Sequence, residues 1–544
     1  MKKFLGILLA LVGLVLTAAG IAGVILIGSD DTVDSPATTI ELGDAKAVVS
    51  TPGLLAFTDT TMRLTAESTG GSVFLGRAHP IDAKSYLATA PTYAVTKVDT
   101  SGMSGEVVKG DAKTTLPDPG KQTFWTAKAT GAGKQSLALE LDGTPTEYVV
   151  MPIGKPGDVI VTSGIQIKNG FTLSIGALVL GVLALISGGL LLRRRKNTLA
   201  TGHEANTTKE TVVATDVPAP ARTMSRIVGI GVIAAVVPAL AGCGMVPTKV
   251  DTWKNDAITK PAMTQPEAVA ALKGYADRKN AVSKSSAATF NPRGWESVDG
   301  GLVLAGDQYD TAYRRLKKDK TVTTGSWTAR RVYSPSFGSY PMYALVSGTS
   351  SYDEEPGERL VALSRASVTA PWVKVATSPA PVSLPDAVAP GDASTLSARD
   401  KKVALAAAGA ITAEINTGKG TVTLPKEVED FLAEWRKRED YLASSRVTAE
   451  LWNPEAADQL SPAGSIFAAK GAKGQVALVT YRLLTTWVAK SDSYVYYNDK
   501  DFAAVIGQSG DRDDLRFQNA LTVAVTLDAK GTPTIVGYDL RDII

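Results

Sequence analysis

The chain has 544 residues, with 57 Lys and Arg against 54 Asp and Glu, two His and one Cys. This length exceeds what one hydrophobic core supports, so we expect several domains. The near-neutral charge balance argues against a dedicated nucleic-acid-binding protein, which would carry a basic face or arm. The scarcity of Cys and His excludes an intramolecular disulfide and a cysteine-ligated metal site, and it argues against a His-based metal cluster. We therefore predict no metal site.

Residues 4–28 form an uncharged apolar run that follows Lys2 and Lys3. About 20 apolar residues span a bilayer, and the run is long for a cleaved signal peptide, so it predicts a first transmembrane helix that acts as a signal anchor. The two lysines predict a cytoplasmic amino terminus. Small residues recur along the run at Gly6, Ala10, Gly13, Thr17 and Gly20. They indicate a seam for close approach of a second helix, or only the general frequency of small residues in membrane helices.

Residues 29–170 are rich in Thr, Val, Gly and Lys and lack a long helical period. Short alternating apolar runs stand at residues 47–49, 62–65, 72–75, 136–139 and 148–151, with turn clusters at 69–71, 118–120 and 155–157. Several short strands separated by turn residues predict an all-β, antiparallel sandwich or barrel.

Four segments in and near these runs carry a resemblance, namely Val73–Ala78, Ser85–Leu87, Phe124–Ala127 and Gly131–Leu137. They resemble an uncharacterised family of actinobacterial membrane proteins. In that family an extracytoplasmic β-domain directly precedes a terminal membrane helix and a basic tail. The resemblance covers roughly residues 72–196 and implies a location in the cell envelope rather than an activity.

A second apolar run occupies residues 171–192 and is followed at once by Arg193, Arg194, Arg195 and Lys196. A basic cluster can also bind nucleic acid or anionic lipid, but beside an apolar run it is typical of a stop-transfer anchor. The positive-inside rule then places the cluster in the cytoplasm and the β-domain outside. Residues 193–223, which include His203, have no apolar period and predict a disordered cytoplasmic linker.

Residues 224–243 form a third hydrophobic segment. Arg222 and Arg226 precede an apolar run that closes with Leu240, Ala241, Gly242 and Cys243. This ending resembles the lipobox of bacterial lipoproteins, which implies a diacylglycerol on the Cys243 thiol. The alternative is a third transmembrane helix with a chance cysteine near its end. Either way the rest of the chain is expected outside the membrane.

Residues 244–385 and 386–544 are predicted to be two α+β repeats. The apolar positions Ala268, Ala271, Leu272, Tyr275 and Val282 recur, at one fixed offset, as Val428, Phe431, Leu432, Trp435 and Leu442. Each set predicts one helix. Thr264 and Glu267 form a capping-box pattern at the first, and Pro425 suits the first turn of the second. Both sets precede an aromatic-Asn-Pro stop, at residues 290–292 and 452–454.

Strand-like runs follow each predicted helix. They are residues 326–333, 341–347, 360–366 and 371–376 in the first half, and 475–484, 494–497, 521–527 and 534–538 in the second. A helix on a curved antiparallel sheet, repeated twice, resembles the cystatin-like (NTF2-like) units of many envelope lipoproteins, and this resemblance implies no activity. Residues 377–396, with their spaced prolines, are interpreted as the joint between the repeats. After this joint, Ser397 and Asp400 are predicted to cap a helix that runs to about Asn416.

Three features invite a chemical role. His79 lacks any partner suggested by spacing, so a surface histidine is the simpler interpretation. Residues 511–514 lack the ligand spacing of a calcium loop and are more simply a solvated loop, as are the charged runs at 353–355 and 436–440. Residues 494–497 could stack on sugars, although aromatics at this spacing usually belong to a core. We predict no catalytic residue.

The sequence thus predicts a multidomain protein of the bacterial plasma membrane, with both large domains extracytoplasmic. Its predicted function is a non-enzymatic scaffold or binding module for an envelope protein or a cell-wall component, with the lipid bilayer as its other partner and no nucleic acid. No cofactor is expected beyond the diacylglycerol on Cys243. The alternative is an enzyme that acts on cell-wall glycan with carboxylates in an α+β concavity. Paired acids in a pocket, one with a raised pKa, would favour the enzyme, and a dry apolar pocket would favour binding.

Overall fold

A computed structural model describes residues 2–99, 101–193, 248–249, 258–352, 357–380, 384–391, 395–453, 460 and 464–543. The chain divides into two compact units. The first comprises residues 1–83 and 89–255, and the second comprises residues 84–88 and 256–544.

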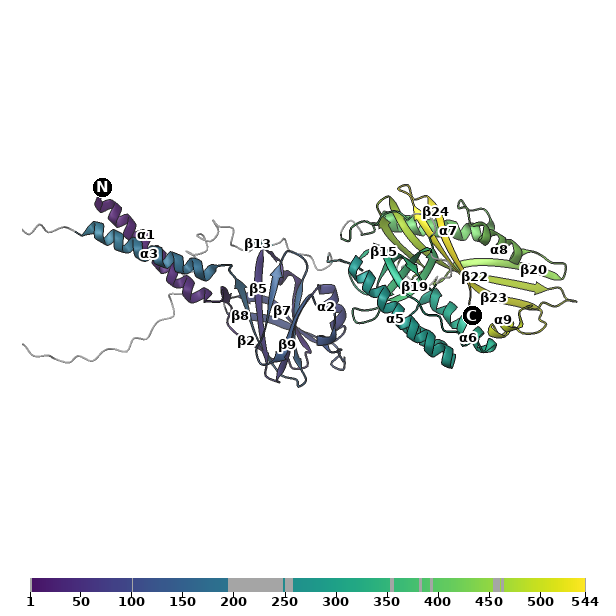
Figure 1. Ribbon diagram of the computed structural model, residues 1–544, viewed down its shortest axis with the longest axis horizontal. Helices are drawn as coiled ribbons and strands as arrows, with labels where there is room; N and C mark the ends of the chain where they lie inside the picture. Colours follow the sequence, from purple (N-terminus) through teal and green to yellow (C-terminus); the bar gives the residue numbers. More distant parts are fainter. Residues whose placement is uncertain are drawn as a thin grey trace, which may run out of the picture. The chain divides into compact units, whose positions relative to one another are not determined.

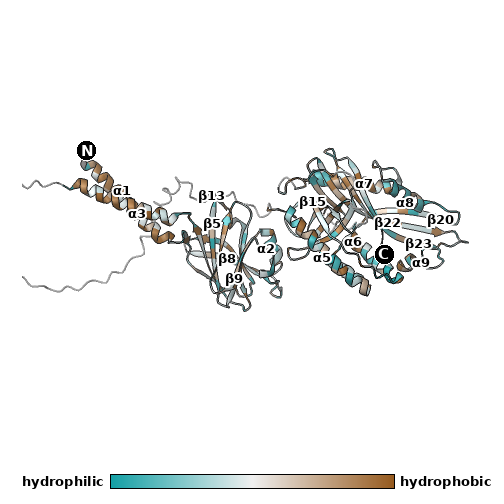
Figure 2. Ribbon diagram, in the orientation of Figure 1, coloured by the Kyte–Doolittle hydropathy of each residue, from teal (hydrophilic) through white to brown (hydrophobic). Residues whose placement is uncertain are grey.

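Two apolar helices of the first unit, α1 (Lys2–Ile27) and α3 (Gly170–Leu192), are long and apolar enough to cross a membrane. They pack against each other as an antiparallel pair (Figure 1). In Figure 2 the ribbons of both helices are mostly brown, the colour of hydrophobic residues. This pair confirms the membrane-compatible character of both predicted spans.

The small residues predicted on the first span lie in the contact between α1 and α3. A Cβ atom placed on Gly13 would lie 2.7 Å from the backbone nitrogen of Leu185, and one on Gly20 would lie 2.5 Å from that of Leu178. From the other helix, a Cβ on Gly181 would lie 2.4 Å from the backbone nitrogen of Thr17. The backbones therefore approach too closely for any larger residue, a geometry that small residues also allow between membrane helices.

Two sheets form the β-domain of the first unit. One has the strand order β1-β12-β5-β10, with β2 also paired to β12, and the other has the order β8-β7-β3-β11-β6-β9. The elements are β1 (Thr32–Asp34), β2 (Thr38–Ile40), β3 (Ala47–Ser50), η1 (Pro52–Leu55), β4 (Phe57–Thr58), β5 (Thr60–Ser68), β6 (Ser72–Ala78), α2 (Pro80–Leu87), β7 (Thr92–Asp99), β8 (Gly102–Val108), η2 (Pro119–Lys121), β9 (Ala127–Ala132), β10 (Gln135–Leu141), β11 (Glu147–Ile153) and β12 (Val159–Gln166).

The inner faces of these sheets share one core. Leu64 of β5, Leu75 of β6 and Val150 of β11 are fully buried in it. All five predicted runs are strands, and the pairing is antiparallel except between β3 and β7, which are parallel. The helix α2 lies in the connection between β6 and β7 and was not predicted. A separate short strand, β13 (Thr248–Lys249), pairs with β4.

The second unit contains two antiparallel sheets, with the orders β15-β17-β18-β19 and β20-β22-β23-β24, and β21 pairs with β22. Its elements are β14 (Lys260–Pro261), α5 (Gln265–Thr289), η4 (Pro292–Ser297), α6 (Gly301–Lys317), β15 (Trp327–Tyr333), β16 (Ser336–Phe337), β17 (Met342–Ser350), β18 (Glu358–Arg365), β19 (Val373–Pro379), α7 (Ala398–Thr417), α8 (Lys426–Arg436), β20 (Leu442–Leu451), β21 (Ile466–Gly471), β22 (Gly474–Ala489), α9 (Lys500–Val505), β23 (Asp514–Leu527) and β24 (Pro533–Ile543).

Helix α5 packs against β15 of the first sheet, α7 and α8 cover the second sheet, and the two sheets face each other. Tyr343 of β17 lies in the contact between the sheets. Its hydroxyl donates to the carbonyl of Ala468 at 2.8 Å and accepts from the same residue's N–H at 3.3 Å. Helix α6 contacts β19 of the first sheet and β24 of the second, and its Leu302 and Tyr309 join core clusters of the second sheet. Helix α6 therefore lies against an edge strand of each sheet.

The capping predictions are confirmed and the helix repeat is not. Capping boxes begin α5 at Thr264 and α7 at Ser397. The predicted second helix, however, ends at Arg436, and Leu442 begins strand β20. The stop at Trp452 and Asn453 therefore follows a strand rather than a helix. The fixed sequence offset aligned α5 with α8. In the structure two helices precede each sheet, α5 and α6 before the first and α7 and α8 before the second. The counterpart of α5 in chain order is therefore α7.

Candidate functional site

Most residues singled out in the sequence lie outside the described part of the chain. These are Leu240, Ala241, Gly242 and Cys243 of the lipobox-like segment, together with Arg194, Arg195, Lys196, Arg222, Arg226 and His203. Lys2 and Lys3 begin α1, and Arg193 directly follows the last residue of α3. Lys2, Lys3 and Arg193 therefore stand at the same end of the helix pair.

The other sequence candidates are structural or solvent-exposed. The Nδ1 atom of His79 accepts a hydrogen bond at 3.3 Å from the backbone N–H of Ile81, at the start of α2. Residues 494–497 do not form a strand, and only Val495 makes an isolated bridge. Val495 is buried, whereas Tyr494 and Tyr496 are exposed and do not join the core.

The second unit holds a polar pocket of about 220 Å³ that the sequence analysis did not identify. Helices α5 and α6, the short helix η4 and the loop after α6 form its walls, and Arg541 of β24 completes it. Its lining combines the aromatic side chains of Phe290, Trp295 and Tyr352 with the carboxylates of Asp307 and Asp310. Hydroxyl and cationic side chains also line it, namely Ser283, Ser286, Thr311, Thr323, Lys279 and Arg314.

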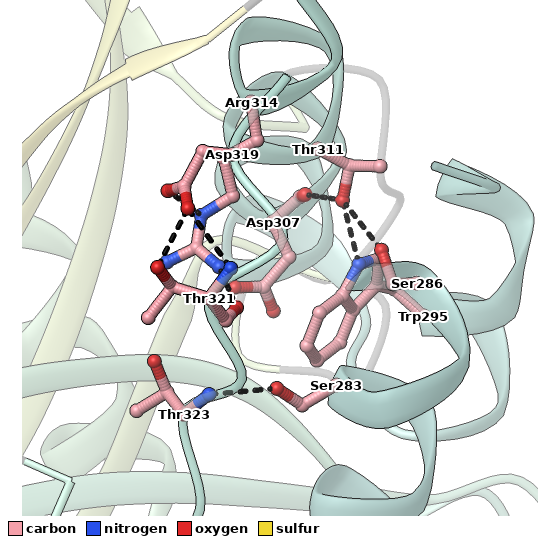
Figure 3. Close-up of polar contacts among 9 residues, drawn as sticks. All are labelled: Ser283, Ser286, Trp295, Asp307, Thr311, Arg314, Asp319, Thr321 and Thr323. Atoms are coloured by element: carbon pink, nitrogen blue, oxygen red, sulfur yellow. Dashed lines mark hydrogen bonds and ion pairs between the residues drawn. The ribbon is translucent and has the colours of Figure 1, made fainter. Parts of the chain in front are cut away.

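Hydrogen bonds between helices hold one wall of this pocket (Figure 3). The Thr311 hydroxyl donates to the carbonyl of Asp307 at 2.8 Å and accepts from the indole N–H of Trp295, also at 2.8 Å. Ser286 of α5 lies 3.3 Å from the same hydroxyl. These contacts link α5, η4 and α6, so the aromatic wall is fixed by the secondary structure around it.

The loop after α6 forms the opposite wall. The Arg314 guanidinium donates to the carbonyl of Thr321 at 2.8 Å and pairs with Asp319 at 3.8 Å. The backbone N–H of Thr323 donates to Ser283 of α5 at 3.2 Å. Figure 3 shows these contacts around the side chain of Asp307, whose carboxylate takes no part in them.

A cluster of buried charges lies behind the pocket. Asp299, Asp307 and Lys374 are only 2%, 7% and 4% exposed. The Tyr275 hydroxyl donates to Asp299 at 2.9 Å, and the ammonium of Lys374 lies 5.1 Å from the centre of the Tyr275 ring. Charges buried to this degree require partners, because desolvation is costly.

The two carboxyl groups have opposite pKa shifts. Burial and the nearby charge of Asp307 raise the pKa of Asp299 to about 7. Burial also opposes ionisation of Asp307, but the ammonium of Lys279 and a hydrogen bond with Asp299 outweigh it and lower the pKa of Asp307. Two close carboxyl groups cannot both ionise readily, so one keeps its proton and donates a hydrogen bond to the other. Asp299 is the protonated partner below neutral pH.

Burial also lowers the pKa of Lys374, to about 7. Lys279, which reaches the pocket, lies over the rings of Tyr352 and Trp295 at 5.2 and 5.7 Å. The cluster therefore contains two groups, Asp299 and Lys374, that change charge close to neutral pH.

Asp307 offers the pocket a buried carboxylate. The Oδ2 atoms of Asp307 and Asp299 are both buried, and among the described residues neither has a donor apart from the proton that the two carboxyl groups share. A buried carboxylate oxygen without a donor is destabilising unless a ligand, water or shared proton satisfies it. Because Asp307 lines the pocket and Asp299 does not, a ligand in the pocket would meet Asp307.

A signal for this site was present in the sequence. Val303, Asp307 and Thr311 follow one another at a spacing of four, so Asp307 falls on the same helical face as a buried valine. Lys374 interrupts the apolar strand Val373–Ala376 in the same way. A charged residue at a core position of either element indicates a buried polar site, although it does not show that the two meet.

No protein-family model, curated protein or solved structure matches this chain. The resemblances to actinobacterial membrane proteins, to lipoproteins and to cystatin-like units therefore stay predictions. The chemistry of the pocket has to be inferred from its own residues.

Proposed function

We propose that this chain is a cell-envelope membrane protein of bacteria whose extracytoplasmic domains act as a non-enzymatic binding module. The antiparallel packing of α1 and α3 supports this topology, because it brings both ends of the β-domain to one face of the membrane. The Asp31 carboxylate accepts a hydrogen bond from the backbone N–H of Phe171 at 2.8 Å, close to where the chain leaves α1 and enters α3. With Lys2, Lys3 and Arg193 at the other end, the positive-inside rule orients the β-domain outward and residues 193–223 toward the cytoplasm.

We also propose that Cys243 carries a diacylglyceryl group at the outer face. The pairing of β13 with β4 supports this placement, because β13 begins five residues after Cys243 and β4 belongs to the unit between the two spans. Tags at both ends of the chain, with intact-mass analysis of wild type and Cys243→Ala, test it. Two fragments, with a lipid mass on the carboxyl-terminal one, are expected in wild type and absent from the variant. A single species indifferent to Cys243 would contradict lipidation and cleavage.

The polar pocket is the proposed binding site, and the buried carboxylate of Asp307 in its wall is the observation that carries it. A ligand hydroxyl would donate to this carboxylate, and the ring of Trp295 offers an apolar face for the other side of the ligand. At about 220 Å³ the pocket is smaller than the roughly 300–1,000 Å³ of sites for drug-sized ligands. It fits one small hydroxylated unit, which in the cell envelope means a single sugar residue of the wall.

Binding can be measured on the detergent-purified full chain by tryptophan fluorescence, because Trp295 lines the pocket. The probes are the monosaccharides and disaccharides released from purified cell-wall glycan. Asp307→Asn is expected to weaken binding about tenfold, because one charge-assisted hydrogen bond is lost. The control is Asp513→Asn, a change at an exposed loop. If no wall sugar binds, or if both variants bind like wild type, the proposed site is wrong.

A glycan-acting enzyme is the second candidate, favoured by the split pKa values of Asp299 and Asp307. Glycosidases, however, place their two carboxyl groups roughly 5–9.5 Å apart on either side of the scissile bond. Here the carboxyl groups share a hydrogen bond, and Asp299 does not reach the pocket. Release of reducing sugar from wall glycan, lost in Asp307→Asn, would favour the enzyme over the binding module.

A further inference from the structure

The β-domain has an apolar cavity of about 560 Å³ at the end next to α1. One of its lining residues, Leu26, belongs to the last turn of α1, while Met62 and Leu141 belong to the core between the sheets. The cavity therefore runs from the end of an apolar helix into the core of the β-domain. It is separate from the polar pocket and shares no residue with it.

The walls of this cavity are mostly apolar, with a few polar groups among them. Leu54, Phe57 and Val98 are partly buried side chains packed against the core, and they line it. Asp34 and Asp99 also line it, and Asp99 pairs with Lys97 at 2.6 Å. A site of this size with apolar walls and a few polar groups is typical of a site for an extended apolar ligand.

Apolar surface continues from α1 to the cavity. Leu26 is 51% exposed, and Val33 and Ile165, which face each other across strands β1 and β12, are 37% and 43% exposed. All three line the cavity. Exposed apolar side chains gathered at one place mark an interaction site. Because α1 is apolar to its last turn, this site lies at the level where a spanning helix leaves the bilayer.

We propose that this cavity binds a long acyl chain of a membrane lipid. The inference rests on the proposal that α1 and α3 span the membrane, since the bilayer then supplies acyl chains at the mouth of the cavity. An acyl chain that enters from the bilayer removes the apolar walls of the cavity from water, which makes a long chain the favoured occupant.

Two sources can supply the chain, namely a phospholipid of the bilayer and the diacylglyceryl group proposed for Cys243. Lys249 of β13 pairs with Phe57, which lines the cavity. Cys243 precedes Thr248 by five residues, and five extended residues span at most about 17 Å. A lipid on Cys243 would therefore begin close enough for its chains to compete for the cavity.

The test uses the full chain in vesicles of phosphatidylglycerol and phosphatidylethanolamine. A small fraction of the phosphatidylglycerol carries a photoreactive diazirine at the end of one acyl chain. After illumination, adducts are mapped by peptide mass analysis. Labelling of α1 and α3 reports insertion, and labelling of residues 54–62, 98 or 141 reports occupancy of the cavity.

Two variants challenge the cavity. Ile165→Asp places a charge at its exposed mouth, and Val98→Trp fills it from a partly buried position. Both should reduce cavity adducts at least about tenfold, the effect expected for loss of one buried aliphatic contact. Val107→Asp is the matched control, because Val107 is 55% exposed on the same domain and does not line the cavity.

Each outcome decides a point. Equal cavity labelling in wild type and Cys243→Ala indicates a bilayer phospholipid, and labelling that appears only in Cys243→Ala indicates that the protein's own lipid fills the site. Labelled helices with an unlabelled cavity in both proteins would overturn the acyl-chain proposal and leave the membrane topology intact. Unlabelled helices would instead refute the topology on which it rests.

Discussion

Replacing Asp299 by Asn tests the buried charge cluster through the pH dependence of stability. In wild type the pKa of this carboxyl is raised from 3.8 to about 7 in the folded protein. The folded state therefore binds one proton more than the unfolded state between these values. By linkage, the free energy of unfolding then falls as pH rises, by about 1.4 kcal/mol per pH unit and by roughly 4 kcal/mol across the window. The asparagine cannot titrate, so this contribution disappears in the variant.

The measurement is urea unfolding of the detergent-purified full chain between pH 4.5 and 6.5, followed by tryptophan fluorescence. Six of the eight tryptophans belong to the second unit, so the signal reports mainly on that unit. Lys374, whose pKa is lowered to about 7, contributes the opposite slope only above this range. The free energy of unfolding should decline less steeply with pH in Asp299→Asn than in wild type, and Asp513→Asn should keep the wild-type slope. Identical slopes in all three proteins would show that Asp299 keeps no extra proton.

Three further predictions concern packing and capping. Gly181→Leu should disrupt the α1–α3 pair, and the measurement is the loss of disulfide cross-linking between cysteines engineered into the two helices. Gly176→Leu is the control and should keep the cross-link, because a Cβ there meets nothing within 4 Å. Equal cross-linking in both variants would contradict the close approach of the helices. Tyr343→Phe should lower the free energy of unfolding by about 1–3 kcal/mol, since the backbone of Ala468 loses its partner, and an unchanged urea midpoint would argue against that contact. Thr264→Ala should lower the free energy of unfolding by about 1 kcal/mol, because the α5 cap is lost. An unchanged free energy in the same urea titration would contradict this role of the cap.

Local signals predicted much of the fold. Apolar runs of sufficient length gave both membrane-compatible helices, and the recurrence of small residues anticipated their contact. Capping boxes at Thr264 and Ser397 marked two helix starts to the residue, because the cap is a hydrogen-bonding pattern contained in four consecutive residues. Alternating apolar runs located most of the strands, because this alternation is also a pattern of consecutive residues.

Features that depend on distant residues were missed. The apolar period from Val428 through Trp435 was extended to Leu442, although the strand β20 that begins there is set by pairing with β22. The pocket joins α5, α6 and Arg541 of the last strand, which are up to about 260 residues apart in the chain. Asp307 and Lys374 each broke an apolar pattern, but only the fold brings both to Asp299. Sequence spacing carries no information on which distant residues come into contact.

If α1 and α3 span the membrane as proposed above, the antiparallel helix pair also determines how the β-domain can be released from the cell. The exposed connection between β8 and η2, residues 109–118, is the kind of segment that proteases cut. Because each end of the domain continues into its own apolar helix, one cut leaves both halves fixed to the membrane and to each other through the strands of the two sheets. Shedding of this domain therefore requires two cuts, one beside each helix. A protein attached by a single helix or a single lipid is released by one.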